Sequence, residues 1–103
     1  MDYQIILSPA SIASLEAVTA WIAKDNPSVA ERIGNELLDK IALLKKFPKA
    51  GSVYAANKDW RKLVSRPYII VYRISPKLRT IEVLAFRHSA RASHPDQPFS
   101  QIT

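Results

Sequence analysis

The sequence predicts a single α+β domain in which a short strand and two helices precede three antiparallel strands. Three observations support this prediction. The chain has 103 residues, the usual length of one domain. Its first half holds two apolar patterns with helical spacing, each opened by a capping residue and a proline. Its second half holds three runs rich in β-branched and aromatic residues, which we expect to pair as sequential antiparallel strands.

The first strand is expected at residues 3–7, which are β-prone and are stopped by Ser8 and Pro9. Ser8 can accept a backbone N–H as an N-cap, and Pro9 suits the first position of a helix. The helix is expected to end near Lys24. Its apolar residues recur at intervals of three and four, with Trp21 beside them: Ile12, Leu15, Val18 and Ile22.

Asn26 and Pro27 repeat the same signal and open a second helix, which we expect to run to Phe47 and to stop before Pro48. Because the connection is so short, the two helices should form an antiparallel hairpin whose apolar stripes face a common core. The stripe of the second helix is Ala30, Ile33, Leu37, Leu38, Ile41 and Leu44.

Residues 49–59 lack clean periodicity and are predicted to form a loop. The predicted strands follow at residues 60–64, 68–75 and 80–87. In residues 68–74 both alternating sets are largely apolar, so this strand should lie in the middle of the sheet. Beyond His88 the composition becomes polar and proline-rich, and we expect one domain over residues 1–91 and a C-terminal tail over residues 92–103.

The composition excludes several classes of protein. There is no cysteine, so the chain has neither disulfides nor thiolate ligands, which fits a reducing compartment. The N-terminus lacks a basic region, and its apolar run, residues 5–7, is too short for a signal peptide or a membrane span, so we expect a cytoplasmic protein. Internal repeats, heptads and glycine-rich phosphate loops are absent from the sequence, and nothing in it predicts a cofactor.

The net charge of +6 is distributed unevenly. Residues 1–59 hold seven Lys/Arg and seven Asp/Glu, whereas residues 60–103 hold eight Lys/Arg and two acids, Glu82 and Asp96. This asymmetry indicates an acidic or polyanionic macromolecular partner for the C-terminal half, although a basic charge can also serve solubility alone.

Basic and aromatic residues alternate along the predicted strands. Cations for phosphate and flat rings for stacking are the side chains that nucleic-acid sites use. The alternative is that the aromatic residues are core and the arginines a solvated edge. The candidate target-binding residues are Trp60, Arg61, Lys62, Arg66, Tyr72, Arg73, Arg87, His88 and Arg91.

His88 and Arg91 lie where the last predicted strand ends. His88 could exchange a proton near neutral pH, and Arg91 could neutralise a phosphate. A histidine with no carboxylate in sequence reach is more often structural than catalytic. His88 and His94 form no i, i+4 pair and have no nearby acidic ligand, so no metal site is predicted.

The ordered set of these signals resembles the RelE/ParE superfamily of bacterial toxins, and more closely its ParE branch, which includes plasmid stabilisation proteins. The resemblance covers residues 3–91. It rests on the junction at residues 21–27 with Ala30 after it, the stop at residues 44–51, the run Arg61-Lys62-Leu63, the strand of residues 68–74, and residues 83–88 with Arg91.

The resemblance implies a β-α-α-β-β-β fold in which the N-terminal helical hairpin packs on a small, mainly antiparallel, twisted sheet. It also implies a cognate antitoxin, ParD-like or similar, that wraps its C-terminal segment over the toxin to form a hetero-oligomer. The helical stripe can be a groove for such a partner or plain core, and its candidate antitoxin-binding residues are Ala30, Ile33, Leu37 and Ile41.

RelE-like members cut messenger RNA in the ribosome, and ParE-like members inhibit DNA gyrase. This sequence has Ile69 and Ser89 where the RelE pattern has arginines, which removes charge that an anionic transition state needs. Gyrase inhibition is therefore the leading hypothesis. The alternatives are an endoribonuclease that uses Arg61, Lys62, His88 and Arg91, an inactive member kept for antitoxin binding, and a plain nucleic-acid-binding module.

Overall fold

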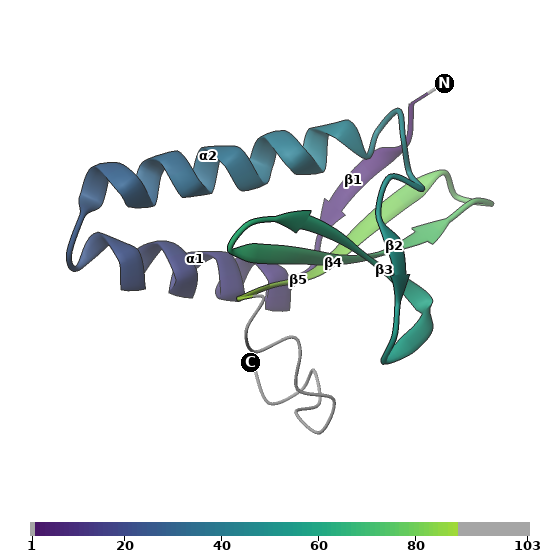
Figure 1. The fold of residues 1–103 in the computed structure, drawn as a ribbon. Helices are drawn as coiled ribbons and strands as arrows, with labels where there is room; N and C mark the ends of the chain where they lie inside the picture. The colour runs from purple at the N-terminus through teal and green to yellow at the C-terminus, as the bar shows by residue number, and fades with distance from the viewer. Residues whose placement is uncertain (1, 89–103) are drawn as a thin grey trace.

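The computed structural model describes residues 2–88, which form two helices and one five-stranded sheet (Figure 1). The predicted tail at residues 92–103 lies outside the described residues. The elements follow one another as β1 (Gln4–Leu7), α1 (Pro9–Ala23), α2 (Pro27–Leu43), β2 (Ser52–Tyr54), β3 (Asn57–Ser65), β4 (Tyr68–Ser75) and β5 (Thr80–His88). The predicted α+β class, with a helical hairpin on a mainly antiparallel sheet, is confirmed.

Both helices begin where the sequence predicts, because their caps are local. The Ser8 hydroxyl accepts the Ser11 N–H at 3.0 Å, and the Asn26 side chain accepts the Val29 N–H at 3.2 Å. The predicted end of the second helix at Phe47 is wrong, since α2 ends at Leu43. The chain from there to Phe47 tightens into successive turns that are still hydrogen-bonded to the last helical carbonyls.

The sheet has the strand order β1-β5-β4-β3-β2. β1 runs parallel to β5, and the other pairs are antiparallel. β4 is the central strand, as its two apolar faces predict. The loop predicted at residues 49–59 is wrong, because it contains β2 and the start of β3. β2 is only three residues long and is held by its pairing with β3, so its sequence carries no periodicity of its own.

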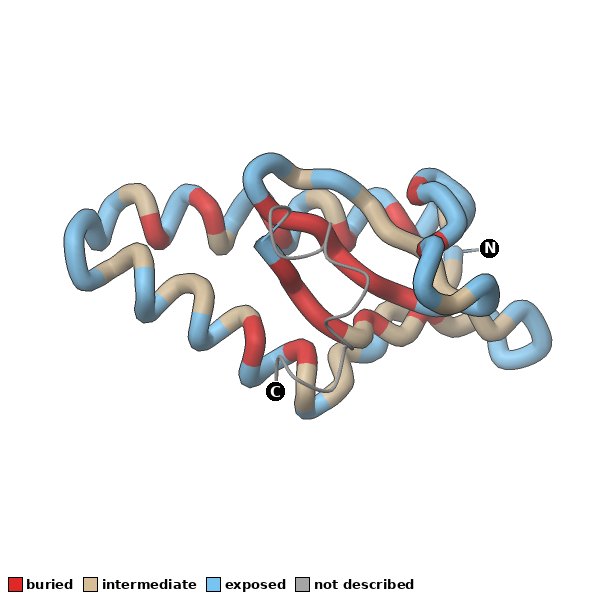
Figure 2. The backbone as a smooth tube through the Cα atoms, turned by 60° about the horizontal axis from the view of Figure 1, so that its bottom comes forward, coloured by how far each residue is buried: buried red, intermediate tan, exposed pale blue. Residues whose placement is uncertain are grey.

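The main core lies between α2 and one face of the sheet, which we call the inner face. Ile33, Leu37 and Ile41 of α2 pack against Tyr68, Ile70, Val83 and Phe86 of β4 and β5. Figure 2 shows this buried layer as the central red strands and the red turns of the helix. A second cluster, Leu44, Tyr72 and Ile81, continues the core toward the far end of the sheet. The helical hairpin therefore covers one face of a sheet whose other face it leaves open.

α1 packs differently from its prediction. Ile12, expected in the core, is 44% exposed, whereas Ser11 and Ser14 are buried. The reason is that β1 pairs with β5 only as far as Val83, so α1 lies along the unpaired edge beyond it. There the Ser14 hydroxyl accepts the Phe86 N–H at 3.0 Å. A hydroxyl satisfies this buried edge better than an apolar side chain can.

Within residues 2–88, neither helix is both long enough and apolar enough to cross a lipid bilayer.

Candidate functional site

Strand pairing decides which predicted site residues lie on the same face of the sheet, because residues directly opposite one another project to one side. Lys62 pairs with Val71, Ile69 with Arg87, and Arg73 with Glu82. These pairs point away from the inner face, and the buried cluster on their side contains no helix residue. We call this surface the open face, and it is formed by Tyr54, Trp60, Lys62, Val64, Ile69, Val71, Arg73, Glu82, Leu84, Ala85 and Arg87.

The floor of the open face is a small aromatic and aliphatic cluster. Tyr54, Ile69 and Val71 are buried in it, and the Tyr54 and Trp60 rings lie 6.1 Å apart. Arg87 belongs to this floor, with only 4% of its surface exposed, and its Nη1 donates to the Tyr54 hydroxyl at 2.8 Å. A positive charge beneath the surface is screened less by water than a charge on the surface.

Arg73 is held by an ion pair on the same face. Its Nη2 lies 2.6 Å from Glu82 Oε1, and its Nε donates to the same oxygen at 2.7 Å. Glu82 therefore balances the charge of Arg73. Lys62 is a further predicted cation on this face, where it pairs with Val71.

Arg61 and Tyr72 project to the inner side, and both stabilise the segment that precedes β2. Tyr72 is fully buried, and its hydroxyl donates to the Pro48 carbonyl at 2.7 Å and accepts the Gly51 N–H at 3.0 Å. Arg61 Nη1 donates to the Gly51 carbonyl at 2.6 Å. Burial raises the pKa of Tyr72, while the Gly51 hydrogen bond and the Arg61 charge oppose the rise. Tyr72 therefore holds the fold rather than forming a surface, and Arg61, which is half-buried, has one guanidinium nitrogen bonded to the same segment.

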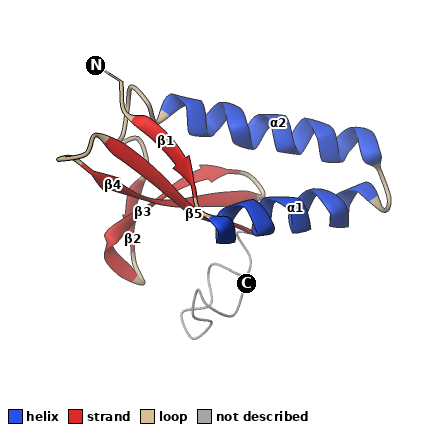
Figure 3. Cartoon of the chain, turned by 180° about the vertical axis from the view of Figure 1, so that it is seen from behind, coloured by secondary structure: helices blue, strands red, loops and turns tan. Residues whose placement is uncertain are grey.

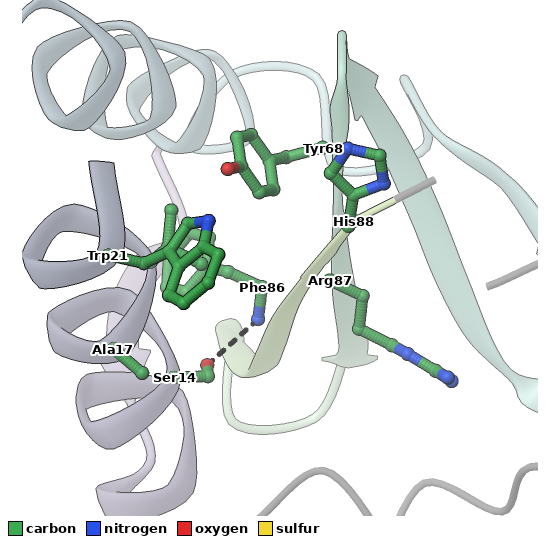
Figure 4. A pocket seen from close by; sticks show the side chains of 8 residues that line it. Ser14, Ala17, Trp21, Tyr68, Phe86, Arg87 and His88 are labelled. Atoms are coloured by element: carbon green, nitrogen blue, oxygen red, sulfur yellow. Dashed lines mark hydrogen bonds between the residues drawn. The ribbon is translucent and has the colours of Figure 1, made fainter. Parts of the chain in front are cut away.

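His88 lies at the end of β5, paired with Tyr68, and its ring meets the Tyr68 ring edge-on at 5.4 Å. Both rings line a pocket of about 330 Å³ together with Trp21 of α1 (Figure 4). In Figure 4 the Arg87 side chain points away from Tyr68 and Trp21, toward the open face. Strand pairing thus places His88 on the opposite side of the sheet from Lys62, although the pocket is also lined by Arg87.

The remaining predicted site residues lie apart from the open face. Arg66 is exposed in the turn between β3 and β4, beside a groove of about 670 Å³ that Leu43 and Val64 also line. Arg91 lies outside the described residues. Among residues 2–88, no group of three or more His, Asp or Glu side chains is placed to hold a metal ion.

The four candidate antitoxin-binding residues prove to be core. Ala30, Ile33, Leu37 and Ile41 are 5%, 8%, 0% and 4% exposed, since they fill the space between α2 and the sheet. This corrects the expectation that their side chains form a partner surface. The accessible groove of the hairpin lies between the two helices, has a volume of about 580 Å³, and is lined by residues that include Leu15, Ala20, Gly34 and Leu38.

Sequence reasoning missed three residues that shape these surfaces. Tyr54 falls in a segment predicted to be a loop, yet it holds Arg87. Trp21, 71% exposed, and Leu38, 46% exposed, were placed beside or within buried stripes. An apolar residue at the margin of a helical stripe can be core or exposed, and only the position of the neighbouring element decides which.

The fold is shared by chains of two solved toxin-antitoxin systems. The structure is similar to a chain of the RelBE2 toxin-antitoxin complex of Mycobacterium tuberculosis, with a TM-score of 0.66 and 18% identity over 85% of this chain and 99% of that chain. It is likewise similar to a chain of the chromosomal ParDE system of P. aeruginosa, with a TM-score of 0.70 and 16% identity over 84% of this chain and 95% of that chain.

The sequence comparisons identify the family. The family model of the ParE toxin of the type II toxin-antitoxin system parDE matches residues 5–93. A toxin candidate of Sinorhizobium fredii, Y4kP, is 33% identical over 81 residues, which are 77% of this chain and 80% of that protein. The chain therefore belongs to the family of ParE toxins of type II toxin-antitoxin systems.

Proposed function

We propose that this toxin inhibits DNA gyrase by binding it, without catalysing a reaction, and that it acts in the cytoplasm until a cognate antitoxin neutralises it. Membership of the ParE family supports the target. The open face supports the mode of action, because it offers aromatic surface and positive charge to a macromolecule.

One observation carries the choice of binding over catalysis: the residues that a ribonuclease would need are on different sides of the sheet. Arg61 is opposite Tyr72 on the inner side, where it bonds to Gly51. Lys62 is on the open face, and His88 is opposite Tyr68 on the inner side. General acid–base catalysis needs its groups within hydrogen-bond reach of one substrate. The described residues therefore favour a docking surface over a ribonuclease site.

For the antitoxin we propose the groove between α1 and α2. Leu38 is 46% exposed there, and small residues such as Ala20 and Gly34 leave room for an entering helix or strand. An amphipathic antitoxin segment would bury Leu38 and form the hetero-oligomer.

The experiment that tests the target is a supercoiling assay with purified gyrase and plasmid DNA, run beside RNA cleavage on translating ribosomes. We expect loss of supercoiling and trapped, linearised DNA, with the messenger RNA intact. Lys62→Glu should weaken inhibition on the order of tenfold, because it reverses a charge on the open face. His88→Ala should leave inhibition unchanged.

The opposite pattern would replace this proposal. Cut messenger RNA with normal supercoiling, abolished by His88→Ala, would establish the endoribonuclease. If neither activity is seen with the protein freed of its antitoxin, the chain is an inactive member kept for antitoxin binding.

A further inference from the structure

A second surface lies at the far end of the sheet, where three segments that are distant in sequence meet. The Tyr3 N–H donates to the Lys45 carbonyl at 2.9 Å, and the Gln4 N–H donates to the Arg79 carbonyl at 2.9 Å. These bonds join the start of β1 to the end of the α2 region and to the turn between β4 and β5 (Figure 1). We call this end the basic pole, and it comprises residues 2–4, 44–51 and 74–80.

The basic pole exposes large apolar side chains and contains a groove. Phe47 is 61% exposed and Leu78, in the turn between β4 and β5, is 75% exposed. The groove has a volume of about 610 Å³ and is lined by Tyr3, Phe47, Pro48, Lys49, Ala50, Ile74 and Pro76. A phenyl ring and an isobutyl group that stay in water cost free energy. Burial against a partner would recover that free energy.

The rim of this groove is positively charged. Arg79 lies over the Tyr3 ring, 4.8 Å from its centroid, so one cation packs directly on the aromatic wall. In the three described segments of the pole, Asp2 is the one acidic residue. The cations there, all exposed, are Lys45, Lys46, Lys49, Lys77 and Arg79.

We propose that the basic pole docks an extended acidic polypeptide segment of a partner protein, in which large apolar side chains are interspersed with Asp and Glu. The apolar side chains would fill the groove between Phe47 and Ile74, and the carboxylates would face the lysines of the rim. This is the composition that complements the surface in both polarity and charge.

An acidic protein segment fits this surface better than a nucleic acid or an anionic membrane does. A nucleic-acid backbone would meet the cations but would leave the apolar groove empty, since duplex bases are stacked. An anionic membrane would meet Phe47 and Leu78 but, being flat, would not fill a groove of about 610 Å³.

This surface is separate from the open face. β4 runs from Tyr68 to Ser75 and β5 runs back from Thr80 to His88, so the pole lies at the opposite end of both strands from His88. The inference goes beyond the proposed inhibition of gyrase and does not require that gyrase be the target.

The test is a binding experiment with the full chain on an array of overlapping peptides. The array covers the gyrase subunits, the ribosomal proteins and the product of the neighbouring gene. We expect the chain to capture peptides that combine Asp or Glu with Leu, Ile or Phe. The double variant Phe47→Ser/Leu78→Ser and the double variant Lys45→Glu/Lys77→Glu should each weaken capture about tenfold, a change of about 1.4 kcal/mol in binding free energy.

The matched control is Ile12→Ser/Lys24→Glu, which removes an exposed isoleucine and reverses an exposed cation on the helical hairpin instead. It should leave capture of the acidic peptides unchanged. All four altered pole side chains are exposed, so the melting temperature should stay near that of the parent.

Three results would overturn the proposal. They are no capture of acidic peptides, capture that the pole variants do not weaken, and pole-dependent binding seen only with duplex DNA or with anionic lipid vesicles. The array measures binding and the supercoiling assay measures inhibition, so the two results are independent. Pole-dependent capture supports this proposal even if gyrase is not inhibited, and its loss refutes the proposal even if gyrase is inhibited.

Discussion

The inner and open faces of the sheet are built from the same three strands, β3 to β5, but they differ in what covers them. On the inner face α2 packs a continuous apolar layer against Ile70, Val83 and Phe86, which are at most 1% exposed. On the open face a smaller cluster around Tyr54 and Val71 shares the surface with one ion pair, Arg73–Glu82, and a buried arginine. The difference teaches that, among residues 2–88, the helices stabilise one face of the sheet and do not cover the other.

Leu37→Ala tests this division most strongly. Leu37 is fully buried between α2 and the sheet, so its truncation should lower the free energy of unfolding by about 2–5 kcal/mol. Leu38, its neighbour in the same helix, is 46% exposed, so Leu38→Ala should lower the free energy of unfolding by about 0.5 kcal/mol or less. Urea denaturation measures both, and equal effects would show that α2 does not pack as described.

Gly51→Ala should cause the second-largest loss in the free energy of unfolding. A Cβ there would collide with the Lys62 carbonyl and would lie 2.8 Å from the Tyr72 hydroxyl, so we expect a loss of about 1–3 kcal/mol. Gly34→Ala is the control, because its Cβ would meet only Thr19 Cγ2 at 3.4 Å. In a helix that change should be neutral or stabilise by up to about 1 kcal/mol. The melting temperature should therefore fall for Gly51→Ala and should stay level or rise for Gly34→Ala.

Tyr72→Phe should cost about 1–2 kcal/mol, because it removes the hydroxyl that serves both the Pro48 carbonyl and the Gly51 N–H. It should also change the response to alkali. The folded-state pKa of Tyr72 lies above its unfolded value of 10.0, so its contribution is present below pH 10 and is lost as the pH rises above it. Unfolding curves at neutral and alkaline pH should show a shallower decline above pH 10 for the variant than for the parent.

Arg73→Ala should have the smallest effect, under about 1 kcal/mol, because its ion pair with Glu82 is solvent-exposed. A double-mutant cycle with Glu82→Gln measures the coupling, which should fall as salt is added. The helical pair Arg32–Glu36, at 3.5 Å and also exposed, is the comparison, and its coupling should be weaker still, about 0.3–0.5 kcal/mol. Coupling of several kcal/mol at Arg73 would mean that the open face also carries stability.

Much of the fold could be predicted because its signals are local. Ser8 with Pro9 and Asn26 with Pro27 fix the helix starts through hydrogen bonds that span three residues. The doubly apolar strand of residues 68–74 predicts its own central position. β2 could not be predicted in the same way, since three residues gain their strand conformation only by pairing with β3.

The candidate site was harder to predict, because the face on which a side chain lies depends on register. The pairing of β4 with β5 shifts between Val71 and Tyr72. As a result Val83, opposite Tyr72, and Ala85, opposite Val71, lie on different faces although they are two residues apart. Simple alternation would have placed them together.

The sequence by itself determined the fold class, the order of the elements apart from β2, and the residues at which the helices begin, since capping, periodicity and strand composition act over a few residues. The family was indicated by the resemblance of its ordered motifs. Only the tertiary structure decided which residues form surfaces. It placed Arg61 and Tyr72 inside, put Arg87 under Tyr54, and brought Lys45 and Lys77, from opposite halves of the chain, to one pole. The sequence gives the charge of each segment. The electrostatic field at a surface, however, is the sum of the charges of all segments that folding brings together there.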